Sequence, residues 1–572
     1  MTSVAADSSE RPFAFPDPKT SDPRDRRTQR VFEVIPGGLA WTVIIGMFLG
    51  SWLAPIEAAV FVIVYDIYWI FLTMYVAFFS SISFRSLRRG MRINWWERLA
   101  RVRDTEGYMK ELSDRRRLLG RMLREEKLSF RERRIVRRER RELARHSREL
   151  AEIAARKESV PDYQEIIHAV LLPTAGEGAD IIEPALQSIA DSNFPKSQIV
   201  ILLATEEREP EQTRIPKVDY LREKFGHVFR DFIVTVHEVA DGEMKCKASN
   251  ATYAAKKLQA YLDDRDISYD RVIFSNFDCD SVVHPEYFSA LTYHYVIEPD
   301  RLRRAYQPIP MYDNNIWDTN AFVRVTMIGS SFWHMYQGTR REMVTFSSHS
   351  EPFDTLVRVG FWPVNMISED SIIYWKAFAY FHGDYRVQAI PLPISLDATL
   401  ADTYWKTIVN SYKQKRRWAY GIEGFPVTMR AIWPDRKTPF FRKLRVGFEM
   451  LEGHLSWAVA PLILSFLGWL PLFFGGSVFN ESVLAHNLPV VTKTLMTISM
   501  GGLIVFVSLS FLMLPPRPKR YGKFRHGLMF AQWILAPFFA LLGALPAIDS
   551  QTRIMTKHYF GEFWVTEKVR KK

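Results

Sequence analysis

Long apolar stretches near both ends of the chain alternate with strongly charged segments. Residues 37–55, 58–83, 456–475 and 489–514 each contain at most one charged side chain. A helix needs about 20 mostly apolar residues to cross the hydrocarbon core of a bilayer. The pattern therefore predicts two membrane-spanning helices before the central part of the chain and two after it.

The basic residues beside these stretches predict their orientation. Four arginines precede the first stretch and four follow the second: Arg24, Arg26, Arg27 and Arg30, then Arg85, Arg88, Arg89 and Arg92. The connector 475–487 contains no Lys or Arg, whereas the next connector, 515–526, is strongly basic. Because basic loops remain on the cytoplasmic side, we expect the central domain and both termini to be cytoplasmic.

A fifth apolar stretch, residues 527–548, has two alternative interpretations. As a membrane span it would place the tail outside, yet from Gln551 onwards the chain carries six Lys or Arg against two Glu. Pro537 and Pro546 also disfavour an unbroken helix. We therefore expect an interfacial or re-entrant segment, and an ordinary fifth span is the alternative.

One segment accounts for the whole net charge of the chain. Residues 85–160 hold 25 Lys or Arg against 13 Asp or Glu, and this excess equals the formal net charge of +12. Leucines at helical spacing and many Glu/Arg pairs three or four apart predict helix over residues 97–158. Aromatic side chains are scarce there, which disfavours a nucleic-acid partner. Contact with anionic lipid headgroups and a solvated helical hairpin packed on the central domain are the two alternatives.

The central part of the chain has the pattern of a globular α/β domain. Short apolar runs rich in β-branched residues predict strands at 165–172, 198–204, 232–239 and 271–277. Helical patterns separate them, at 179–192, 218–226 and 248–264. Strands that alternate with helices indicate a mostly parallel sheet, with chemistry at the carboxyl ends of the strands.

These patterns divide the chain of 572 residues into seven parts. They are an N-terminal tail (1–36), two membrane helices (37–84), the basic helical segment (85–160), the α/β domain with interfacial helices at its end (161–435), a second pair of membrane helices with a basic loop (436–526), the ambiguous stretch (527–548) and a basic tail (549–572). Two cysteines are too few for a disulfide framework.

The strongest local signal for chemistry is Asp278-Cys279-Asp280, directly after the strand predicted at 271–277. Two acids one residue apart at a strand end provide hard oxygen ligands for a divalent cation. Such a cation can bridge a diphosphate and neutralise the charge of a leaving group. The same short pattern also occurs by chance in loops and caps, so it needs support from other motifs.

Two further motifs follow in a fixed order, Ser368-Glu369-Asp370 and Gln414-Lys415-Arg416-Arg417-Trp418. Together with the acidic pair, they resemble the D-x-D, T-E-D and Q-x-x-R-W pattern of membrane-integrated family 2 glycosyltransferases, the group that contains cellulose and hyaluronan synthases. The segment that begins at Lys247 is similar to the family's K-A-G-N. The resemblance implies a GT-A type cytoplasmic domain, an α/β fold, inserted between N- and C-terminal transmembrane helices.

The resemblance also implies roles for the acidic motifs. Asp370 would be the general base on the acceptor hydroxyl, with Glu369 beside it. Ser368, Glu369 and Asp370 would equally suit the first turn of a helix, which is the structural alternative. Asp280 would bind Mg²⁺ or Mn²⁺, and Asp278 would contact the nucleotide.

In the third motif, Gln414 and Arg417 would bind the diphosphate, for which the fixed donor geometry of arginine is suited. Trp418 would offer a flat apolar face to the acceptor sugar. Its alternative role is to anchor an amphipathic helix at the membrane interface.

Residues in the first half of the domain would complete the nucleotide site. Thr174 and Glu177 follow the first predicted strand, and Glu206 follows the second. With Lys247, these are the further residues that we expect to bind nucleotide or diphosphate. In the family, the acid that contacts uridine is normally an aspartate. This chain has Glu206 at that place, so the assignment assumes that a glutamate makes the same contact.

The tail contains a last motif, with Phe563, Val565, Thr566 and Lys568 in the order Phe-x-Val-Thr-x-Lys. It is similar to the family's gating loop, which closes over the nucleotide from the cytoplasmic side. Residues 345–362, in contrast, do not resemble the acceptor site of cellulose synthases.

The resemblance implies an integral plasma (inner) membrane enzyme of bacterial type. It would be a metal-dependent, inverting transferase that takes a nucleotide-activated sugar, a UDP-sugar, synthesises a β-linked polysaccharide and translocates it. The expected partners are the sugar donor, a growing glycan or lipid acceptor, and membrane lipids. The alternatives are transfer of a single sugar to a lipid, and a non-catalytic membrane scaffold with a nucleotide-binding domain.

Overall fold

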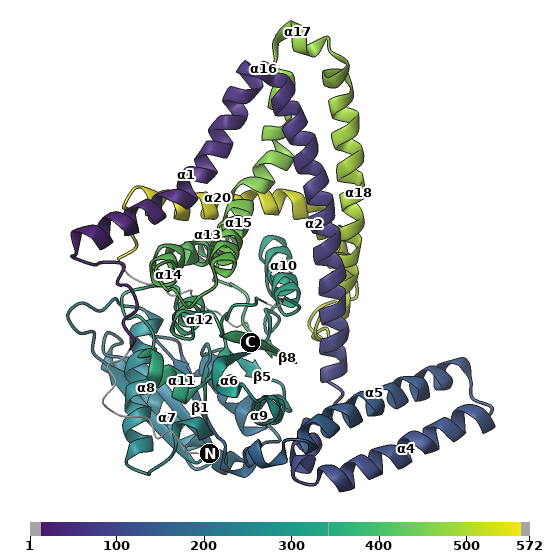
Figure 1. Ribbon diagram of the computed structural model, residues 1–572, viewed down its shortest axis with the longest axis vertical. Coiled ribbons are helices and arrows are strands. Elements are labelled where there is room, and N and C mark those ends of the chain that lie inside the picture. The colour runs from purple at the N-terminus through teal and green to yellow at the C-terminus, as the bar shows by residue number, and fades with distance from the viewer. Residues whose placement is uncertain (1–12, 341, 562–572) are drawn as a thin grey trace.

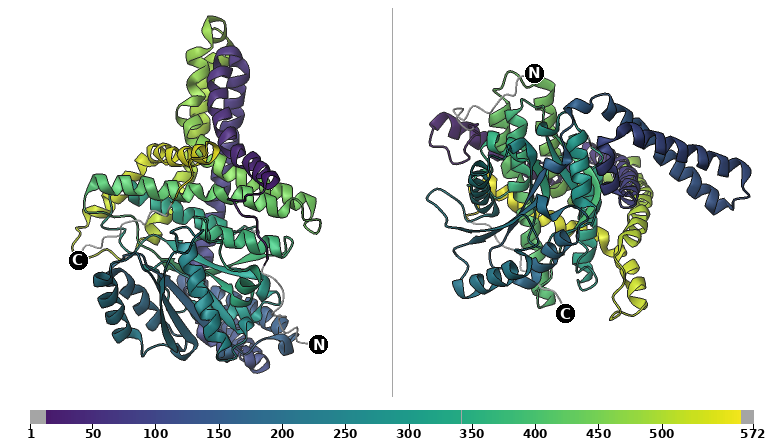
Figure 2. Two further views of the ribbon diagram at one scale, coloured as in Figure 1. Left: turned by 90° about the vertical axis from the view of Figure 1, so that its left-hand side faces the viewer. Right: turned by 90° about the horizontal axis from the view of Figure 1, so that it is seen from below.

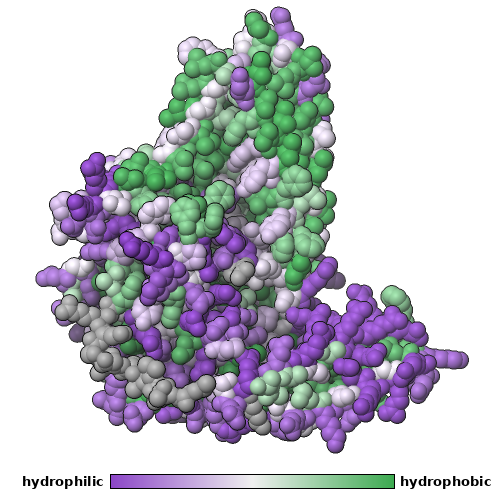
Figure 3. All heavy atoms as spheres, in the orientation of Figure 1, coloured by the Kyte–Doolittle hydropathy of each residue, from purple (hydrophilic) through white to green (hydrophobic). Residues whose placement is uncertain are grey.

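The computed structural model describes residues 13–340 and 342–561. Figure 1 shows an α/β domain at one end, long helices that rise from it, and a separate helical hairpin at its side. Apolar side chains gather on the rising helices, whereas the surface of the domain and the hairpin is mostly hydrophilic (Figure 3). The chain is therefore divided into a membrane part and a soluble part, as the hydropathy pattern predicts.

Three single helices of the rising group match predicted spans. They are α1 (Pro23–Leu53), α2 (Pro55–Gly90) and α18 (Val483–Met513), all long and apolar enough to cross a bilayer. The span expected at 456–475 is not one straight helix. It consists of α15 (Phe440–Ser465) and, after a short 3-10 turn, α16 (Leu470–Phe474), which are bent by 48°.

The bend follows from local sequence. Phe466 leaves the helical conformation with φ −139° and ψ −58°, and Pro471 in the first turn of α16 has no N–H to continue the hydrogen-bond ladder. Chain reversals at Ala54 and around α17 (Gly476–Asn480) lie at the end of the molecule farthest from the sheet (Figure 1). This placement agrees with the expectation that both connectors lie outside.

The ambiguous stretch forms α19 (Phe524–Ala531), a 3-10 turn (Gln532–Leu535) and α20 (Ala536–Met555). Together they are long and apolar enough to cross a membrane. Yet α20 lies crosswise to α2 and α18, between the rising helices and the α/β domain (Figure 1, Figure 2). The arrangement favours an interfacial helix, which stays a prediction because length and composition alone also fit a span.

The first and the last long helices are joined to each other. Arg30 donates to the carbonyls of Ile554 and Met555 at 3.0 and 2.7 Å, and Trp41 Nε1 donates to Thr552 Oγ1 at 2.9 Å. At Gly37 a Cβ atom would lie 2.7 Å from the backbone oxygen of Gln551, so the two helices approach too closely for a side chain there. Helix α20 is thus fixed against α1.

An eight-stranded mixed sheet forms the centre of the α/β domain, in the order β3-β2-β1-β4-β7-β6-β8-β5. The first four are parallel to one another, and β7 pairs antiparallel with both β4 and β6. The strands are β1 (Ile167–Pro173), β2 (Ile199–Glu206), β3 (Asp231–His237), β4 (Val272–Asn276), β5 (Val282–Val283), β6 (Arg304–Met311), β7 (His349–Pro352) and β8 (Arg386–Ser395).

Helices cover both faces of the sheet and separate two buried apolar clusters. One cluster contains residues of α8 (Lys247–Asp263), α11 (Phe353–Val359), α12 (Glu369–Tyr380) and α14 (Gly424–Ile432). The other contains residues of α3 (Trp95–Ala100), α6 (Ala179–Ala190), α7 (Glu211–Phe225) and α9 (Tyr287–Ile297). The α/β class and its place between apolar helices are confirmed, and the carboxyl ends of β1, β2 and β4 share one edge.

The basic segment forms a hairpin of α4 (Thr105–Glu125) and α5 (Phe130–Ala154). Ser129 and Glu132 form a reciprocal cap at the start of α5, which explains why the helix expected over 97–158 is interrupted before this point. The hairpin projects from the body beside the lower end of α2, at the opposite end of the molecule from the chain reversals (Figure 1, Figure 2). This position favours the solvated hairpin over the headgroup contact.

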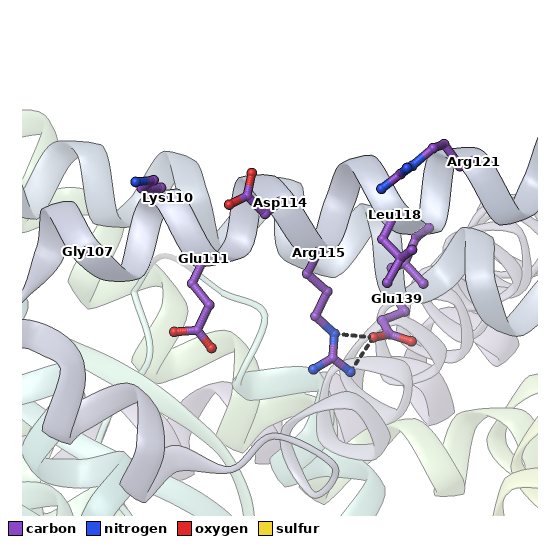
Figure 4. Close-up of a pocket in the computed structure, with 9 residues that line it drawn as sticks. Gly107, Lys110, Glu111, Asp114, Arg115, Leu118, Arg121 and Glu139 are labelled. Carbon is purple, nitrogen blue, oxygen red and sulfur yellow. Dashed lines mark hydrogen bonds and ion pairs between the residues drawn. The ribbon is translucent and has the colours of Figure 1, made fainter.

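An open hollow of about 820 Å³ runs along this hairpin. Figure 4 shows its lining of mostly charged side chains, with Arg115 bonded to Glu139 across the two helices. The hollow contains none of the residues that the sequence predicts for chemistry, so we place the site elsewhere.

Candidate active site

Lys247, the first residue of α8, lies between three predicted carboxylates. Its Nζ donates to Asp278 Oδ1 at 2.8 Å and lies 3.4 Å from Glu369 Oε1 and 3.5 Å from Asp370 Oδ1. Burial disfavours the ammonium, but the charges of Asp278, Asp370 and Glu369 outweigh it, so the pKa of Lys247 lies above its usual value. One cation therefore links the end of β4 with the start of α12.

The two acids at the start of α12 have different environments. The Glu369 side chain is 6% exposed, whereas that of Asp370 is 27% exposed. Burial and then the negative charge of Asp370 raise the pKa of Glu369 to about 8, although Lys247 and Arg417 act in the opposite direction. Of the two, Asp370 is the more exposed carboxylate, and it sits in the first turn of a helix, where negative charge is favoured.

Tyr312, which follows β6, marks the point where the other predicted residues converge. Burial, followed by the charges of Asp278, Asp370 and Asp280, raises the pKa of its phenol, and Arg417 lowers it. Burial lowers the pKa of Arg417, while the charges of Glu369, Asp278 and Asp370 raise it. These groups are close enough to shift one another's pKa, so motifs that are far apart in the sequence lie together in the fold.

Asp280 is buried and firmly held. Its Oδ2 accepts from the backbone N–H of Asp397 at 2.9 Å, and Asn314 donates to its backbone carbonyl at 3.1 Å. No group of three or more His, Cys, Asp or Glu suited to a metal ion occurs within residues 13–340 and 342–561. Mg²⁺ usually needs only one or two carboxylates when phosphates of a substrate supply further oxygens. The acids Asp278 and Asp280 therefore fit a cation that a diphosphate helps to hold.

Helix α13 (Tyr404–Ala419) carries the third motif. Gln414 is buried and accepts from Thr399 Oγ1 at 2.6 Å, which fixes its amide. The Trp418 ring packs against Tyr312, with ring centroids 5.6 Å apart. Trp418 thus reaches the site from the same helix as Arg417. Its expected contact with an acceptor sugar stays a prediction.

The residues predicted after β1 and β2 form a second group at the same edge of the sheet. Glu177 accepts from Thr174 Oγ1 at 3.1 Å and from the backbone N–H of Ala175 at 2.8 Å. Lys217 Nζ donates to Thr174 Oγ1 at 3.2 Å and to Glu209 at 2.6 and 2.7 Å. Sequence reasoning missed the buried pair of Lys217 and Glu209, because neither belongs to a motif.

Glu206, at the end of β2, is buried and forms an ion pair with Arg208. Burial raises the pKa of its carboxyl, whereas Arg208 lowers it and the nearby charge of Glu177 raises it further. Glu206 therefore lies beside the Thr174 group, where a nucleoside contact was expected. The contact itself stays a prediction.

The start of β7 and the two serines before it supply contacts that the sequence did not predict. Ser347 Oγ donates to Asp278 Oδ2 at 2.5 Å, and Ser348 has a left-handed conformation with φ 63°. His349 Nδ1 lies 3.8 Å from Asp370 Oδ1 and donates to the Phe346 carbonyl at 2.8 Å. The only signal in the sequence is a short polar run, Ser-Ser-His-Ser, whose last two residues begin β7.

The gating-like residues Phe563, Val565, Thr566 and Lys568 lie outside the described residues. The chain leading to them passes close to the third motif, because the backbone N–H of Phe560 donates to the Tyr420 hydroxyl at 3.4 Å. The gating role of the four residues stays a prediction.

Comparison with known proteins gives a family match. Residues 275–539 match the family model described as "Glycosyl transferase family group 2". Two curated relatives are named poly-beta-1,6-N-acetyl-D-glucosamine synthase, both from Staphylococcus epidermidis, and are 26% and 24% identical over 192 residues. These matches cover 33% of this chain and 41% of each relative, so the chain matches less than half of the relatives' length.

Solved structures give weaker likenesses. A mannosyltransferase from Pyrobaculum calidifontis, in complex with GDP-Man and Mn²⁺, has a TM-score of 0.38 at 16% identity, with 60% of this chain and 86% of that chain covered. TarS 1-349 of S. aureus, in complex with UDP-GlcNAc, has a TM-score of 0.32 at 12% identity, with 70% of this chain and 93% of that chain covered. These scores are too low to guide the placement of a ligand.

Proposed function

We propose that this chain is a family 2 glycosyltransferase of the membrane, which transfers a sugar from a UDP-sugar to the hydroxyl of a growing β-linked glycan. The observation that carries the proposal is the convergence of Asp278, Asp280, Asp370 and Arg417 beside Lys247 and Tyr312. Acids at a strand end, a partly exposed carboxylate and a partly buried arginine are the groups that such a transfer requires.

Asp370 is the proposed general base. Its carboxylate takes the proton of the acceptor hydroxyl, the hydroxyl oxygen bonds to the anomeric carbon, and the bond from that carbon to the diphosphate breaks. Attack from the face opposite the departing diphosphate inverts the configuration and yields a β-linkage from an α-linked donor. Its greater exposure than Glu369 supports this assignment.

The departing diphosphate carries negative charge, which the site must stabilise. We assign Arg417 and Gln414 to its oxygens, because both lie on α13 at the edge of the acidic cluster. Asp280, with Asp278 beside it, would hold Mg²⁺ or Mn²⁺, which when bound neutralises the diphosphate. Lys247 keeps the three carboxylates together at the distances observed.

The donor sugar and the product are proposed from the relatives. Their names specify a polymer of N-acetylglucosamine, so UDP-N-acetylglucosamine is the first donor to test. The domain lies directly beside the apolar helices (Figure 1), which supports a polymer product that passes through the chain's own spans. The same arrangement supports a cytoplasmic domain and contact with membrane lipids.

The test uses the full chain in detergent or nanodiscs with Mn²⁺ or Mg²⁺ and a panel of UDP-sugars. We expect metal-dependent UDP release and a polymer whose linkage can be analysed. Asp370→Asn should lower turnover by about 10²–10⁴-fold, the range of general base catalysis, and keep UDP binding. A single sugar on a lipid would replace the polymer proposal, and no release with any donor would favour the scaffold.

A further inference from the structure

A short turn connects α13 to the start of α12. Residues Tyr420–Glu423 form a 3-10 turn directly after the third motif. Glu423 Oε1 accepts from the backbone N–H groups of Ile367 and Ser368, both at 2.7 Å, and from Ser368 Oγ at 2.9 Å. One carboxylate oxygen thus receives three hydrogen bonds from the two residues that precede Glu369 and Asp370.

The contact replaces an ordinary helix cap. Ser368 occupies the cap position of α12, but its side chain makes no capping bond to that helix. Its hydroxyl donates instead to a residue 55 positions later. The helix-cap interpretation of the Ser-Glu-Asp motif is therefore not supported for Ser368, and the hydroxyl has a partner outside the helix.

Hydrogen bonds to an ionised acceptor are stronger and more directional than neutral ones. Burial raises the pKa of Glu423 to about 7, although the bonds from Ser368 and Ile367 act in the opposite direction, so the acceptor is ionised above that pH. The carboxylate lies on the chain that continues from Arg417 and Trp418. Any shift of α13 therefore moves the acceptor that holds the backbone before Asp370.

We propose that Glu423 is a positioning residue that fixes Asp370 relative to the diphosphate-binding helix α13. The proposal rests on the proposed transferase function, because it assigns Glu423 an effect on that reaction. Glu423 does not touch the reacting atoms. It acts through Ser368 and Ile367, and reaction rates are sensitive to small displacements of the groups that they position.

The first test measures the clamp without the reaction. Hydrogen exchange of the peptide that covers Ile367 and Ser368 is followed in the full chain, with UDP and Mn²⁺ present. Glu423→Gln should increase exchange there by about 10-fold or more, since the loss of a charged acceptor weakens both backbone bonds. Unchanged exchange would overturn the proposal whatever the enzyme transfers.

The second test measures the effect on transfer. Glu423→Gln should lower kcat about 10–100-fold while the Kd for UDP and the KM for the donor change little. Ser368→Ala should lower kcat less, Ser368→Thr should restore it because the hydroxyl returns, and the double variant should be no slower than Glu423→Gln alone. Unaltered kcat in Glu423→Gln would overturn the proposal.

Glu286 provides a matched control. Its Oε2 accepts from the backbone N–H groups of Trp95 and Trp96 at 2.8 and 3.1 Å, a similar clamp away from the site. Glu286→Gln should lower Tm and leave kcat unchanged. If Glu423→Gln instead lowers Tm, UDP binding and kcat together, its role is only structural and the proposal fails. A wild-type chain without transfer activity would contradict the proposed function, and the exchange result would still decide the clamp.

Discussion

Lys247→Met is the most informative single change, because one buried ammonium faces three carboxylates. The Nζ lies 2.8, 3.4 and 3.5 Å from Asp278, Glu369 and Asp370. At an effective dielectric constant of about 20, each contact is worth nominally about 5 kcal/mol before desolvation is subtracted. Removing one partner from a buried ion pair costs about 3–5 kcal/mol, because the other charges remain buried.

That cost should appear in thermal unfolding and should depend on pH. About 3–5 kcal/mol corresponds to a loss in Tm of roughly 6–20 °C for the soluble domain. In the variant, the three carboxyls that faced the ammonium keep protons in the folded chain. The same carboxyls lose their protons above about pH 4 in the unfolded chain. The folded state then binds more protons than the unfolded state, so stability falls as pH rises. The gap in Tm to wild type should be small near pH 4.5 and widen towards pH 7.5.

Lys376→Met is the control for this experiment. Lys376 is also buried, but it donates to the backbone carbonyls of Gly360 and Phe361, at 3.0 and 2.8 Å. Burial lowers the pKa of Lys376 to about 8, so between pH 4.5 and 7.5 it is charged in both states. Its loss in Tm should not vary over that range. If the loss for Lys247→Met is equally constant, or absent, the assignment of Lys247 as the shared cation is wrong.

Three further predictions address the metal, a buried acid and the topology. Asp280→Asn should raise the Mn²⁺ concentration that gives half-maximal activity by about 10-fold or more, since a carboxylate ligand is lost; unchanged activation would remove Asp280 from the metal site. Burial raises the pKa of Glu351 to about 8, so wild-type stability should fall as pH rises from about 4.5 to 8. Glu351→Gln should reduce that slope in Tm measurements, and an identical slope would contradict the burial of a neutral acid. Lys557 and Glu481 are both exposed. A cysteine introduced at Lys557 should react with an impermeant reagent only from the cytoplasmic side, and one at Glu481 only from the outer side. The two natural cysteines are buried and should not react. Labelling of both from one side would make 527–548 a membrane span.

Sequence periodicity predicted the first half of the sheet better than the second. Strands β1 to β4 are continuous apolar runs between helical patterns, and each lies within about two residues of its expected range. Strands β5 and β7 have only two and four residues, too few to show any period. β7 consists of His, Ser, Glu and Pro and is buried by its neighbours in the sheet, not by its own hydrophobicity.

The order of the motifs predicted the acidic residues at the centre of the site. It did not predict residues that belong to no motif. Asp278 and Asp280 follow a parallel strand, and Gln414 and Arg417 are three apart on one helix face, so local patterns indicate their directions. Tyr312 and Glu423 have no such pattern, since each acts through contacts with residues more than 30 positions away. Only the folded chain brings these partners together.

The attachment of α20 to α1 has a consequence for how the molecule is made. Ribosomes synthesise the chain from its N-terminus, so α1 enters the bilayer long before Thr552, Ile554 and Met555 exist. During that interval Arg30, Gly37 and Trp41 lack the residues of α20 that they contact in the folded chain. Helix α1 can reach its final surroundings only after α20 has been translated, and any nascent chain stalled before α20 would leave that surface open to chaperones and proteases.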